Sequence, residues 1–521
     1  MNRNESLRRL SARTGPFDIA IIGGGASGFG VALEALARGL SVVLLEKSDF
    51  GKGTSSRSTK LLHGGVRYLA QGQMRLVYEA LGERGLLLKA APHLSSVVRF
   101  VIPIYSRYQR LKYTAGLKVY DLMSGRLRIG RSRFVNREDT LRRLPNVQEK
   151  GLLGGVIYHD GQFDDARLLI AIARTCFNMG ACLLNHVKVK SLVKNTKGRI
   201  TGLVANDELS NDNYEINARM VVNATGVFAD KILRMDKPGA PKSIKASQGI
   251  HLVLDHEFLG GQDALMIPDT SDGRVLFILP WKNKLIVGTT DTLRDKPSLE
   301  PDALEEEIDF VLQNAAQFLR RKPTRADVRS VFAGLRPLAM PKEGSTKTKE
   351  VSRSHKVIIS ESGLVSIVGG KWTTFRKMGE DTVLAFSRVS GANLPPRRFF
   401  PNSFHGATPR SDDPLNAYGS DAPAVKALQG ESPEFAEKLH PNHPYTVAEV
   451  VWAARFEMAM TVEDVLSRRI RLLLLDAHAA LQSAPKVAAI LAKELGNDPL
   501  WEQTEVEDFS KIARKYIIQK P

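Results

Sequence analysis

The stretch from Phe17 to Glu46 constrains the possible fold more than any other part of the chain. It begins with the apolar run FDIAII and continues with GGGASG at 23–28, which matches the pattern GxGxxG. A segment of helical periodicity, 26–38, follows, and a second apolar run, 41–45, ends at Glu46. A strand, a glycine-rich turn, a helix and a second strand form a βαβ unit of about thirty residues, which predicts a buried parallel sheet.

Each part of this unit has a physical task in binding a dinucleotide. Gly23 permits the tight turn, Gly25 lets the backbone approach a pyrophosphate, and Gly28 allows the helix and the strand to pack closely. The helix N-terminus offers free N–H groups and the positive end of its dipole to the phosphates. The Glu46 carboxylate can accept hydrogen bonds from ribose hydroxyls. The pattern alone leaves FAD and NAD as alternatives.

Three further features favour FAD. The chain contains one such fingerprint, which leaves no separate site for a nicotinamide donor. The apolar strand 220–223 runs into ATG at 224–226, and in two-domain flavoproteins such a strand returns beside the first βαβ unit and contacts the cofactor. The third feature is GGKWTT at 369–374, which ends a strand and opens a helix. A helix N-terminus at this point can stabilise negative charge on a reduced flavin.

The rest of the chain indicates several domains, because 521 residues exceed what one compact core usually holds. Strand and helix signals alternate through the middle of the chain, and later short alternating runs predict an antiparallel sheet. A linker rich in Pro, Ser and Gly precedes a helical C-terminal region. The main expected elements are a helix at 165–179, strands at 181–189, 251–254, 275–279 and 285–287, a helix at 303–320 and the linker at 391–422.

Cysteine usage and hydropathy exclude several classes of protein. Cys176 and Cys182 match no metal or redox spacing, so we expect no metal site and no disulfide framework. The first residues have no apolar core of the kind a signal peptide needs, and no run of about 18 apolar residues predicts a transmembrane helix. These features fit a reducing compartment.

Several segments carry a more specific resemblance. The run TSSRSTKLLHGGVRYL at 54–69 resembles the signature of FAD-dependent glycerol-3-phosphate dehydrogenases. Three shorter segments agree with it, GTTD at 288–291, GLRPL at 334–338 and GGK at 369–371. MAMTVEDVLSRR at 458–469 is similar to the helical cap of the same family. The resemblance covers nearly the whole chain.

The resemblance implies an α/β, two-domain, FAD-binding Rossmann-type flavoprotein like D-amino-acid oxidase, with an antiparallel substrate sheet and a C-terminal helical cap. The expected FAD-binding domain is discontinuous and the substrate domain is inserted into it. We assign 15–98, 151–240 and 350–388 to the FAD-binding domain, 99–150 and 241–349 to the substrate domain, 389–422 to the linker and 423–521 to the cap.

The family's activity would be oxidation of sn-glycerol 3-phosphate to dihydroxyacetone phosphate, with hydride passing from C2 to the flavin and electrons to a membrane quinone. Members are commonly homodimers, and the quinone-linked ones are peripheral on the cytoplasmic face of the inner membrane. One alternative is a soluble, cytoplasmic oxidase of the same substrate that reduces oxygen to hydrogen peroxide. Another is an FAD-dependent oxidase of the same fold that acts on an amine or amino acid.

The substrate is a phosphate dianion, and arginine suits a phosphate better than lysine because its guanidinium forms a planar fork. Arg67, Arg336 and Arg353 are the candidates, and Arg336 is the strongest because it lies between apolar neighbours. Lys371 either binds the phosphate or supports the reduced flavin. Further substrate contacts are expected from Tyr68 and Thr289, although each also has a purely structural reading.

Hydride loss from C2 requires removal of the hydroxyl proton, and histidine is the side chain that titrates nearest neutral pH. His63 and His251 are equal candidates for this base, and with Arg336 they form the expected catalytic set. The residues expected to contact FAD are Gly23, Gly25, Ala26, Ser27, Gly28, Glu46, Thr54, Ser55, Ser58, Lys60, Leu61, His63, Gly64, Gly65, Ala224, Thr225, Gly226, Gly370, Lys371, Thr373 and Thr374.

The charge of the chain indicates an anionic partner. The formal net charge is +18, with a pI near 9.7. The segment 99–133 contains nine Lys or Arg against one acid, with four interspersed tyrosines. Such a segment can lie on an anionic membrane surface or on nucleic acid, or it can be a solvated face of the substrate domain. We expect it to contact lipid and admit quinone, and we expect no nucleic-acid partner.

Overall fold

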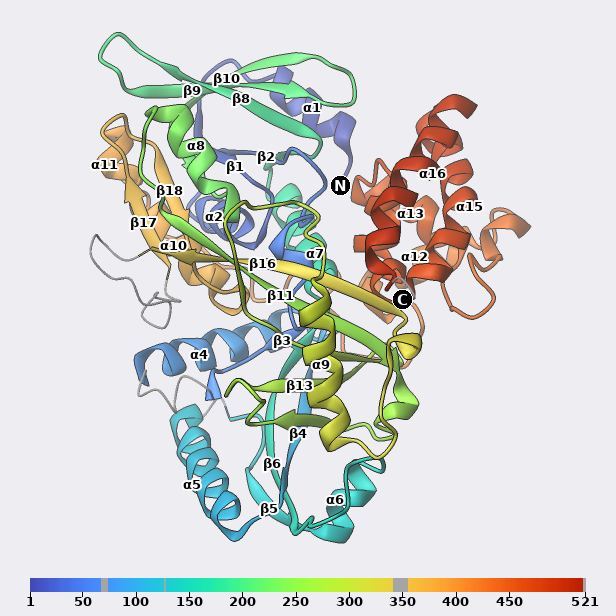
Figure 1. Cartoon of the computed structure of the whole chain (residues 1–521). Helices are drawn as coiled ribbons and strands as arrows, with labels where there is room; N and C mark the ends of the chain where they lie inside the picture. Colours follow the sequence, from blue (N-terminus) through green and yellow to red (C-terminus); the bar gives the residue numbers. More distant parts are fainter. Residues whose placement is uncertain (67–73, 126–127, 341–354, 519–521) are drawn as a thin grey trace.

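The computed structural model describes residues 1–66, 74–125, 128–340 and 355–518. Two β-sheets and a helical domain make up the molecule, and Figure 1 shows the helical domain beside both sheets. Arg67, Tyr68 and Arg353, all predicted to bind substrate, lie outside the described residues. No helix within those residues is both long enough and apolar enough to cross a membrane.

The first sheet is built on the predicted βαβ unit. Strand β1 (Phe17–Ile22) pairs in parallel with β2 (Val42–Leu45) on one side and with β10 (Asn213–Asn223) on the other. Helix α2 (Ala26–Ala37) follows the glycine turn, and its side chains are almost entirely buried. The strand order is β17-β18-β10-β1-β2-β7, with the hairpin β8–β9 attached to β10. The other strands are β7 (Cys182–Leu184), β8 (Val187–Lys194), β9 (Ile200–Asp207), β17 (Lys356–Ile359) and β18 (Val365–Val368).

Helices cover this sheet. They include α7 (Asp165–Asn178), which was predicted, together with α8 (Ala229–Asp236) and α10 (Phe375–Val383). The predicted single strand 181–189 is wrong, because β7 and β8 are separate strands and His186 between them has a φ of +54°. A left-handed residue of this kind interrupts extended backbone.

The second sheet has ten strands and is antiparallel except where β4 and β12 pair in parallel. Its order is β15-β11-β14-β13-β12-β4-β6-β3, with β16 on β11 and β5 on β6. The bounds are β3 (Leu61–Leu62), β4 (Ser95–Ile104), β5 (Arg133–Asn136), β6 (Gly154–Phe163), β11 (Ile244–Asp255), β12 (Ala264–Ile267), β13 (Leu276–Trp281), β14 (Lys284–Gly288), β15 (Thr292–Arg294) and β16 (Ser330–Ala339). The antiparallel strands predicted near 251, 275 and 285 are present.

The second sheet also shifts the predicted domain boundaries. Strand β6, which falls in a range expected for the first domain, pairs with β4 along ten residues and with β5. Because β-ladder hydrogen bonds set sheet membership, β3, β4 and β6 belong to the second sheet. Its helices are α4 (Met74–Ala90), α5 (Arg107–Ser124), α6 (Arg137–Arg143) and α9 (Glu305–Phe318).

The C-terminal region is helical, as predicted. It contains α12 (Ala422–Leu428), α13 (Val447–Glu457), a π-helical turn (Asp464–Arg469), α14 (Leu472–Leu475), α15 (Ala477–Leu495) and α16 (Pro499–Ala513). The predicted linker ends in a short 3-10 helix, Asn416–Asp421, which leads directly into α12.

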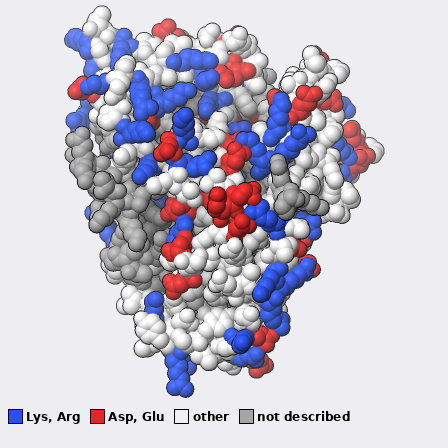
Figure 2. Space-filling view, in the orientation of Figure 1, with Lys and Arg blue, Asp and Glu red and all other residues white. Residues whose placement is uncertain are grey.

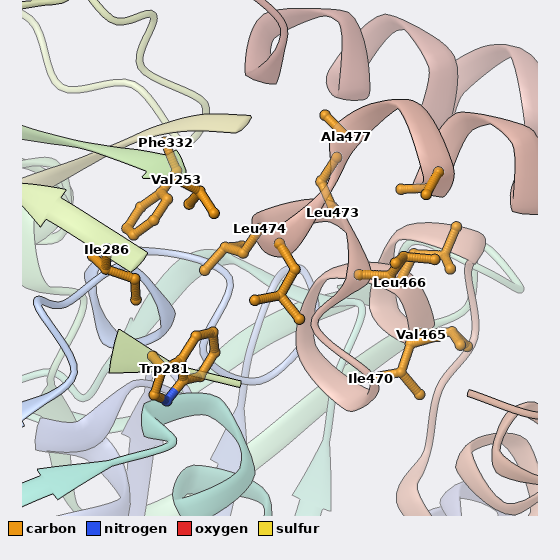
Figure 3. Close-up of a cluster of buried hydrophobic side chains, with 14 of the residues drawn as sticks. Val253, Trp281, Ile286, Phe332, Val465, Leu466, Ile470, Leu473, Leu474 and Ala477 are labelled. Atoms are coloured by element: carbon orange, nitrogen blue, oxygen red, sulfur yellow. The ribbon is translucent and has the colours of Figure 1, made fainter. Parts of the chain in front are cut away.

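The helical domain contacts the second sheet through apolar side chains. Leu473 and Leu474 of α14 belong to the same buried cluster as Trp281, Ile286 and Phe332 of the sheet, and Figure 3 shows these side chains facing one another. All five are less than a tenth exposed. Burying several large apolar side chains contributes about 1.5–3 kcal/mol each, so this contact fixes the helical domain on the sheet.

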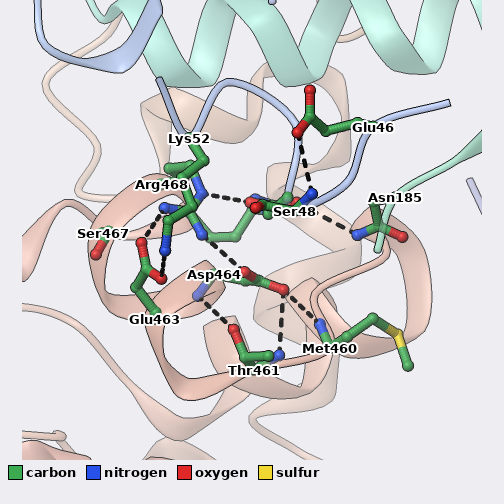
Figure 4. A network of polar contacts seen from close by, with 12 residues as sticks. Glu46, Ser48, Lys52, Asn185, Met460, Thr461, Glu463, Asp464, Ser467 and Arg468 are labelled. Carbon is green, nitrogen blue, oxygen red and sulfur yellow. Dashed lines mark hydrogen bonds and ion pairs between the residues drawn. The ribbon is translucent and has the colours of Figure 1, made fainter. Parts of the chain in front are cut away.

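The same domain contacts the first sheet through buried charges. Arg468 donates hydrogen bonds to Asp49, Glu463 and Asp464, at distances of 2.5 to 2.7 Å, and Figure 4 shows its contacts with the two acids of the helical domain. Arg469 adds two bonds to Asp49, at 2.7 and 2.9 Å. Buried ions require partners. Asp49 is the partner that both guanidinium groups reach across the domain boundary.

Candidate active site

A cavity of about 610 Å³ lies between the two sheets and receives residues from both. On the side of the first sheet, the cavity is lined by the glycine turn after β1, by the loop 51–59 and by residues 369–373. Strands β11 and β16 contribute from the second sheet. The predicted site residues that line it are Gly23, Gly25, Ala26, Ser27, Glu46, Thr54, Ser55, Ser58, Leu61, His63, Ala224, Thr225, Gly226, His251, Arg336, Gly370, Lys371 and Thr373.

The glycine turn leaves backbone open to this cavity. Gly23 has a φ of +110°, and a Cβ there would lie 2.7 Å from the carbonyl oxygen of Ala224. A Cβ at Gly28 would lie 1.9 Å from the carbonyl oxygen of Gly23, so this glycine serves helix packing and does not line the cavity. Gly25 is the N-cap residue of α2 and has extended backbone. These roles match the physical reasons for which the glycines were predicted.

Glu46 lies beside the same turn, at the end of β2. Its Oε2 accepts a hydrogen bond from the Gly24 N–H at 2.8 Å, and its Oε1 accepts one from the Ser48 N–H at 3.0 Å. Burial raises the pKa of this carboxyl group, and the two backbone donors oppose that rise. The carboxylate is thereby held at the cavity wall, where a ribose hydroxyl can reach it.

The loop 54–60 is anchored on both sides of Thr59. Ser58 donates to Asp165 Oδ2 through its backbone N–H, at 3.0 Å, and through its hydroxyl, at 2.7 Å. Lys60 donates to the same oxygen at 2.7 Å and to the Ser56 carbonyl at 2.8 Å. Lys60 is fully buried and does not line the cavity. Its ammonium forms an ion pair with Asp165 inside the protein, and its predicted cofactor contact stays a prediction.

His251 is 2 % exposed and lies on β11, where the cavity reaches the second sheet. Its Nε2 lies 3.0 Å from the hydroxyl of Thr59, and its ring stacks on Phe332 with the centroids 4.9 Å apart. Burial holds the pKa of His251 well below its usual value, and the positive charges of Lys60 and Arg336 lower it further. The imidazole is therefore neutral, with a lone pair on one ring nitrogen.

Arg336 lies on β16, directly opposite Ser247 of β11. Its guanidinium donates to the carbonyl oxygens of Gln248 and Thr290, at 3.2 and 3.0 Å, and to the hydroxyl of Thr289 at 3.0 Å. Arg336 lines the cavity, whereas Thr289 does not and instead orients the guanidinium. The structure thus puts Arg336 and His251 on adjacent strands of one cavity wall.

Three other predicted contacts lie behind the cavity wall. Gly64 and Gly65 are buried, and a Cβ at Gly64 would lie 2.1 Å from the hydroxyl of Tyr120. Thr374 is buried and donates to the Lys371 carbonyl at 3.3 Å. Gly64 is small enough to fit against Tyr120, and Thr374 bonds within its own helical turn. None of the three residues lines the cavity.

The comparisons with known proteins agree with this geometry. The model of the FAD dependent oxidoreductase family matches residues 18–376, and that of the C-terminal domain of alpha-glycerophosphate oxidase matches 365–505. A probable mitochondrial glycerol-3-phosphate dehydrogenase of Caenorhabditis elegans is 39% identical, over 99% of this chain and 75% of its own. The human mitochondrial glycerol-3-phosphate dehydrogenase is 38% identical, over 97% of this chain and 73% of its own. The chain belongs to the FAD-dependent glycerol-3-phosphate dehydrogenase family.

A solved structure extends this likeness to three dimensions. Glycerol-3-phosphate dehydrogenase from Bacillus halodurans, complexed with FAD, superposes with a TM-score of 0.80 and 28% identity. The match covers 100% of this chain and 99% of that one. The expected fold, a two-domain FAD-dependent oxidoreductase with a helical C-terminal domain, is confirmed.

The residues of this family member fit FAD. The glycine turn offers an open backbone at the N-terminus of α2, which favours a pyrophosphate. Glu46 lines the cavity beside the glycine turn, and GGK at 369–371 precedes the helical turn Trp372–Thr374. One cavity is lined both by the glycine turn and by His251 and Arg336. FAD is the cofactor of the family.

Sequence reasoning missed several residues of the cavity wall. Thr59 and Arg57 lie within the quoted signature but were assigned no role. Three consecutive residues of β8 also line the cavity: Val187, Lys188 and Val189. The signature could have pointed to Thr59, whereas β8 carries no motif and joins the site only because β7 and β8 turn beside β2.

Proposed function

We propose that the protein oxidises sn-glycerol 3-phosphate at C2 to dihydroxyacetone phosphate. The observation that carries the proposal is one cavity that joins the dinucleotide cradle at Gly23 and Gly25 to His251, Arg336 and Lys371. The named activity of the relatives and the resemblance of the signature support the same substrate. A small anionic alcohol suits a cavity wall on which the Arg336 guanidinium, the Lys371 ammonium and the His251 imidazole lie.

Arg336 is the residue we expect to hold the phosphate. Its backbone partners and Thr289 hold the guanidinium in place, and Asp291 forms an ion pair with it at 3.8 Å. A guanidinium fixed in this way binds a phosphate through two parallel hydrogen bonds. Lys371 lines the same cavity and adds positive charge. Arg67, Tyr68 and Arg353 remain proposed substrate contacts.

FAD, when bound, accepts the hydride that leaves C2 of the substrate. The protein must then take the hydroxyl proton, and we propose His251 for this task because its imidazole is buried and neutral. His63 lines the cavity as well and remains the second candidate.

The test of this proposal is anaerobic reduction of the purified holoenzyme. Addition of sn-glycerol 3-phosphate should bleach the flavin absorbance rapidly, and glycerol without the phosphate should not. A yellow protein that glycerol 3-phosphate fails to bleach would refute the substrate. Bleaching by an amino acid or amine would favour the alternative oxidase reading.

We propose further that electrons leave the protein to a membrane quinone, from a homodimer bound peripherally at the cytoplasmic face of the membrane. Helix α5 supports this proposal. Its exposed side chains include Tyr108, Leu111 and Leu122, at 72%, 72% and 81% exposure, beside the exposed cations Arg107 and Arg110. An amphipathic helix with exposed apolar and basic residues binds an anionic bilayer surface.

Basic residues also gather elsewhere, so the test needs a matched control. Figure 2 shows many Lys and Arg over the upper part of the molecule, where β8, β9 and α8 lie. The triple reversal Arg107→Glu, Arg110→Glu and Lys112→Glu should abolish flotation with anionic vesicles. The control reversal Lys190→Glu, Lys197→Glu and Lys237→Glu should leave flotation intact. Strong flotation after the α5 reversal would refute the docking proposal.

The acceptor and the oligomer have their own measurements. Reoxidation of the reduced enzyme by a soluble quinone should be much faster than reoxidation by air. Rapid oxygen consumption with peroxide release would favour the oxidase alternative. Sedimentation should give twice the 57.5 kDa mass of the chain if the protein is a dimer.

A further inference from the structure

The imidazole of His251 is fixed by two side chains that come from different parts of the chain. Phe332, opposite it on β16, stacks on the ring with an interplanar angle of 18°. Thr59, which is 192 residues away in sequence, brings its hydroxyl to 3.0 Å from Nε2. A stacked ring can still slide and rotate in its own plane. The hydroxyl contact therefore decides the orientation of the two ring nitrogens.

The position of Thr59 is itself strongly determined. Ser58 and Lys60, its two neighbours, both bond to Asp165 Oδ2. Arg471 of the helical domain donates to Asp165 Oδ1 at 3.0 Å and to the Ser56 carbonyl at 2.8 Å. Further along the loop, the Trp372 indole donates to the Ser55 carbonyl at 2.9 Å. The loop can shift only if buried polar groups lose their partners, which is costly.

The hydrogen-bond inventory of the ring indicates which nitrogen carries the proton. A neutral imidazole has one N–H donor and one bare acceptor. Nδ1 is buried and has no hydrogen-bond partner within the described residues, whereas Nε2 has Thr59. A buried N–H without an acceptor is rarer in proteins than an unfilled acceptor. The proton therefore belongs on Nε2, where the Thr59 oxygen accepts it, and the lone pair belongs on Nδ1.

We propose that Thr59 is a positioning residue for His251, whose Nε2–H donates to Thr59 Oγ1 so that Nδ1 carries the lone pair that takes the substrate's C2 hydroxyl proton. The inference rests on the proposed function. In that step the substrate O–H bond breaks and an N–H bond forms at Nδ1. The C2 hydride leaves for the cofactor and a C=O bond replaces the alcohol.

Thr59 also has an effect on the charge that develops in this step. The imidazolium formed at His251 carries a donor on each nitrogen, and its hydrogen bond to Thr59 becomes charge-assisted. The charged groups that act on the ring are Lys60, from the loop 54–60, and Arg336, from β16, and both oppose a positive charge there. The Thr59 oxygen, 3.0 Å from Nε2, favours it.

The first experiment uses the holoenzyme and stopped-flow reduction of the flavin by sn-glycerol 3-phosphate. Thr59→Val should lower the limiting reduction rate about tenfold, the value of one hydrogen bond, and leave the flavin content and the substrate Kd unchanged. Thr59→Ser retains the oxygen and should restore the rate. Thr140→Val, which removes a buried hydroxyl from α6 far from the loop, should have no effect.

The second experiment asks whether Thr59 acts through His251. In a double-mutant cycle, His251→Asn should lower the reduction rate, and adding Thr59→Val to it should change the rate no further. Reduction followed for hours records even the slow variants. An equal loss from Thr59→Val in both backgrounds would overturn the proposal. So would loss of flavin, which indicates a cofactor contact, or a change confined to the substrate Kd.

These outcomes are separate from failure of the proposed function. If wild-type flavin is not bleached by glycerol 3-phosphate, the substrate proposal fails before any variant is compared. If the wild type is bleached and Thr59→Val is reduced at the wild-type rate, the substrate stands and the positioning role is wrong.

Discussion

Arg471 of the helical domain and Asp165 of α7 form an ion pair of 3.0 Å in which both side chains are fully excluded from solvent. The pair joins residues 306 positions apart and lies directly behind the loop that carries Thr59. The helical domain is thus part of the wall that supports the active site, beyond its contact with the apolar face of the second sheet.

Loss of Arg471 should be strongly destabilising. Arg471→Met leaves the Asp165 carboxylate and the Ser56 carbonyl without one buried partner, and breaking such a pair costs about 3–5 kcal/mol. Denaturant unfolding of the holoenzyme measures this loss. Lys237→Met is the control, because its partner Glu361 is 90% exposed and the pair is solvated, so its unfolding midpoint should not move. A midpoint unchanged by Arg471→Met would show that apolar packing alone holds the helical domain.

The glycine turn should tolerate no side chain at its third glycine. Gly28→Ala would bring a Cβ to 1.9 Å from the Gly23 carbonyl oxygen, so the turn must shift and the purified protein should contain little FAD. Gly82→Ala, in α4, meets nothing within 4 Å. That control should stabilise the helix by roughly 0.5–1 kcal/mol and retain the flavin. The absorbance ratio at 450 and 280 nm reports the cofactor, and full occupancy in Gly28→Ala would contradict the close packing.

Arg336 should determine affinity for the phosphate more than the rate of hydride loss. Arg336→Lys keeps the charge but loses the planar fork, so the KM for glycerol 3-phosphate should rise at least about tenfold. Arg320→Lys changes an exposed arginine paired with Glu149 and should leave KM unaltered. Steady-state assays with an artificial acceptor measure both. A fall in kcat at constant KM would instead assign Arg336 to the transition state.

Glu449 should give the protein a stability that falls with rising pH. Burial raises the pKa of this carboxyl group to about 7, although the Thr446 N–H and the Tyr418 hydroxyl bond to it. The folded state therefore keeps a proton that the unfolded state has already lost. The stabilising contribution is complete below the unfolded pKa and disappears as pH rises through about 7.

Glu449→Gln removes this titration and should flatten the pH dependence of the unfolding free energy between pH 4 and pH 8. Relative to this variant, the wild type should lose up to about 3 kcal/mol over that range. Glu507→Gln, on an exposed face of α16, is the control and should keep the wild-type slope. A wild-type stability that rises over this range relative to Glu449→Gln would show that the carboxyl is ionised in the folded protein.

Much of the site followed from local patterns. The GxGxxG turn, Glu46 and the strand ending in ATG were all recognisable, because each requires particular residue types within one short stretch of backbone. His251 and Arg336 were named as candidates from their chemistry and from the resemblance. The sequence left His63 and His251 equal, since nothing local to either indicates burial, a neighbour or a tautomer.

For other residues the sequence could not show the surroundings, because the deciding contact is distant in the chain. Lys60 was expected at the cofactor, but Asp165 lies 105 residues away and takes its ammonium into the interior. Gly64 was expected at the cofactor too, but the Tyr120 hydroxyl fills the space beside it. The range around β6 was assigned to the first domain, and only its ladder with β4 places it in the second.

The sequence by itself determined the βαβ unit, the family and the chemistry that the site can perform, because glycine conformation, strand patterning and helix dipoles act between near neighbours. The tertiary structure alone decided that Thr59 meets His251 and that Arg471 supports the loop between them. Those contacts depend on how two sheets and a helical domain pack, and packing brings together residues whose spacing in sequence carries no signal of their contact.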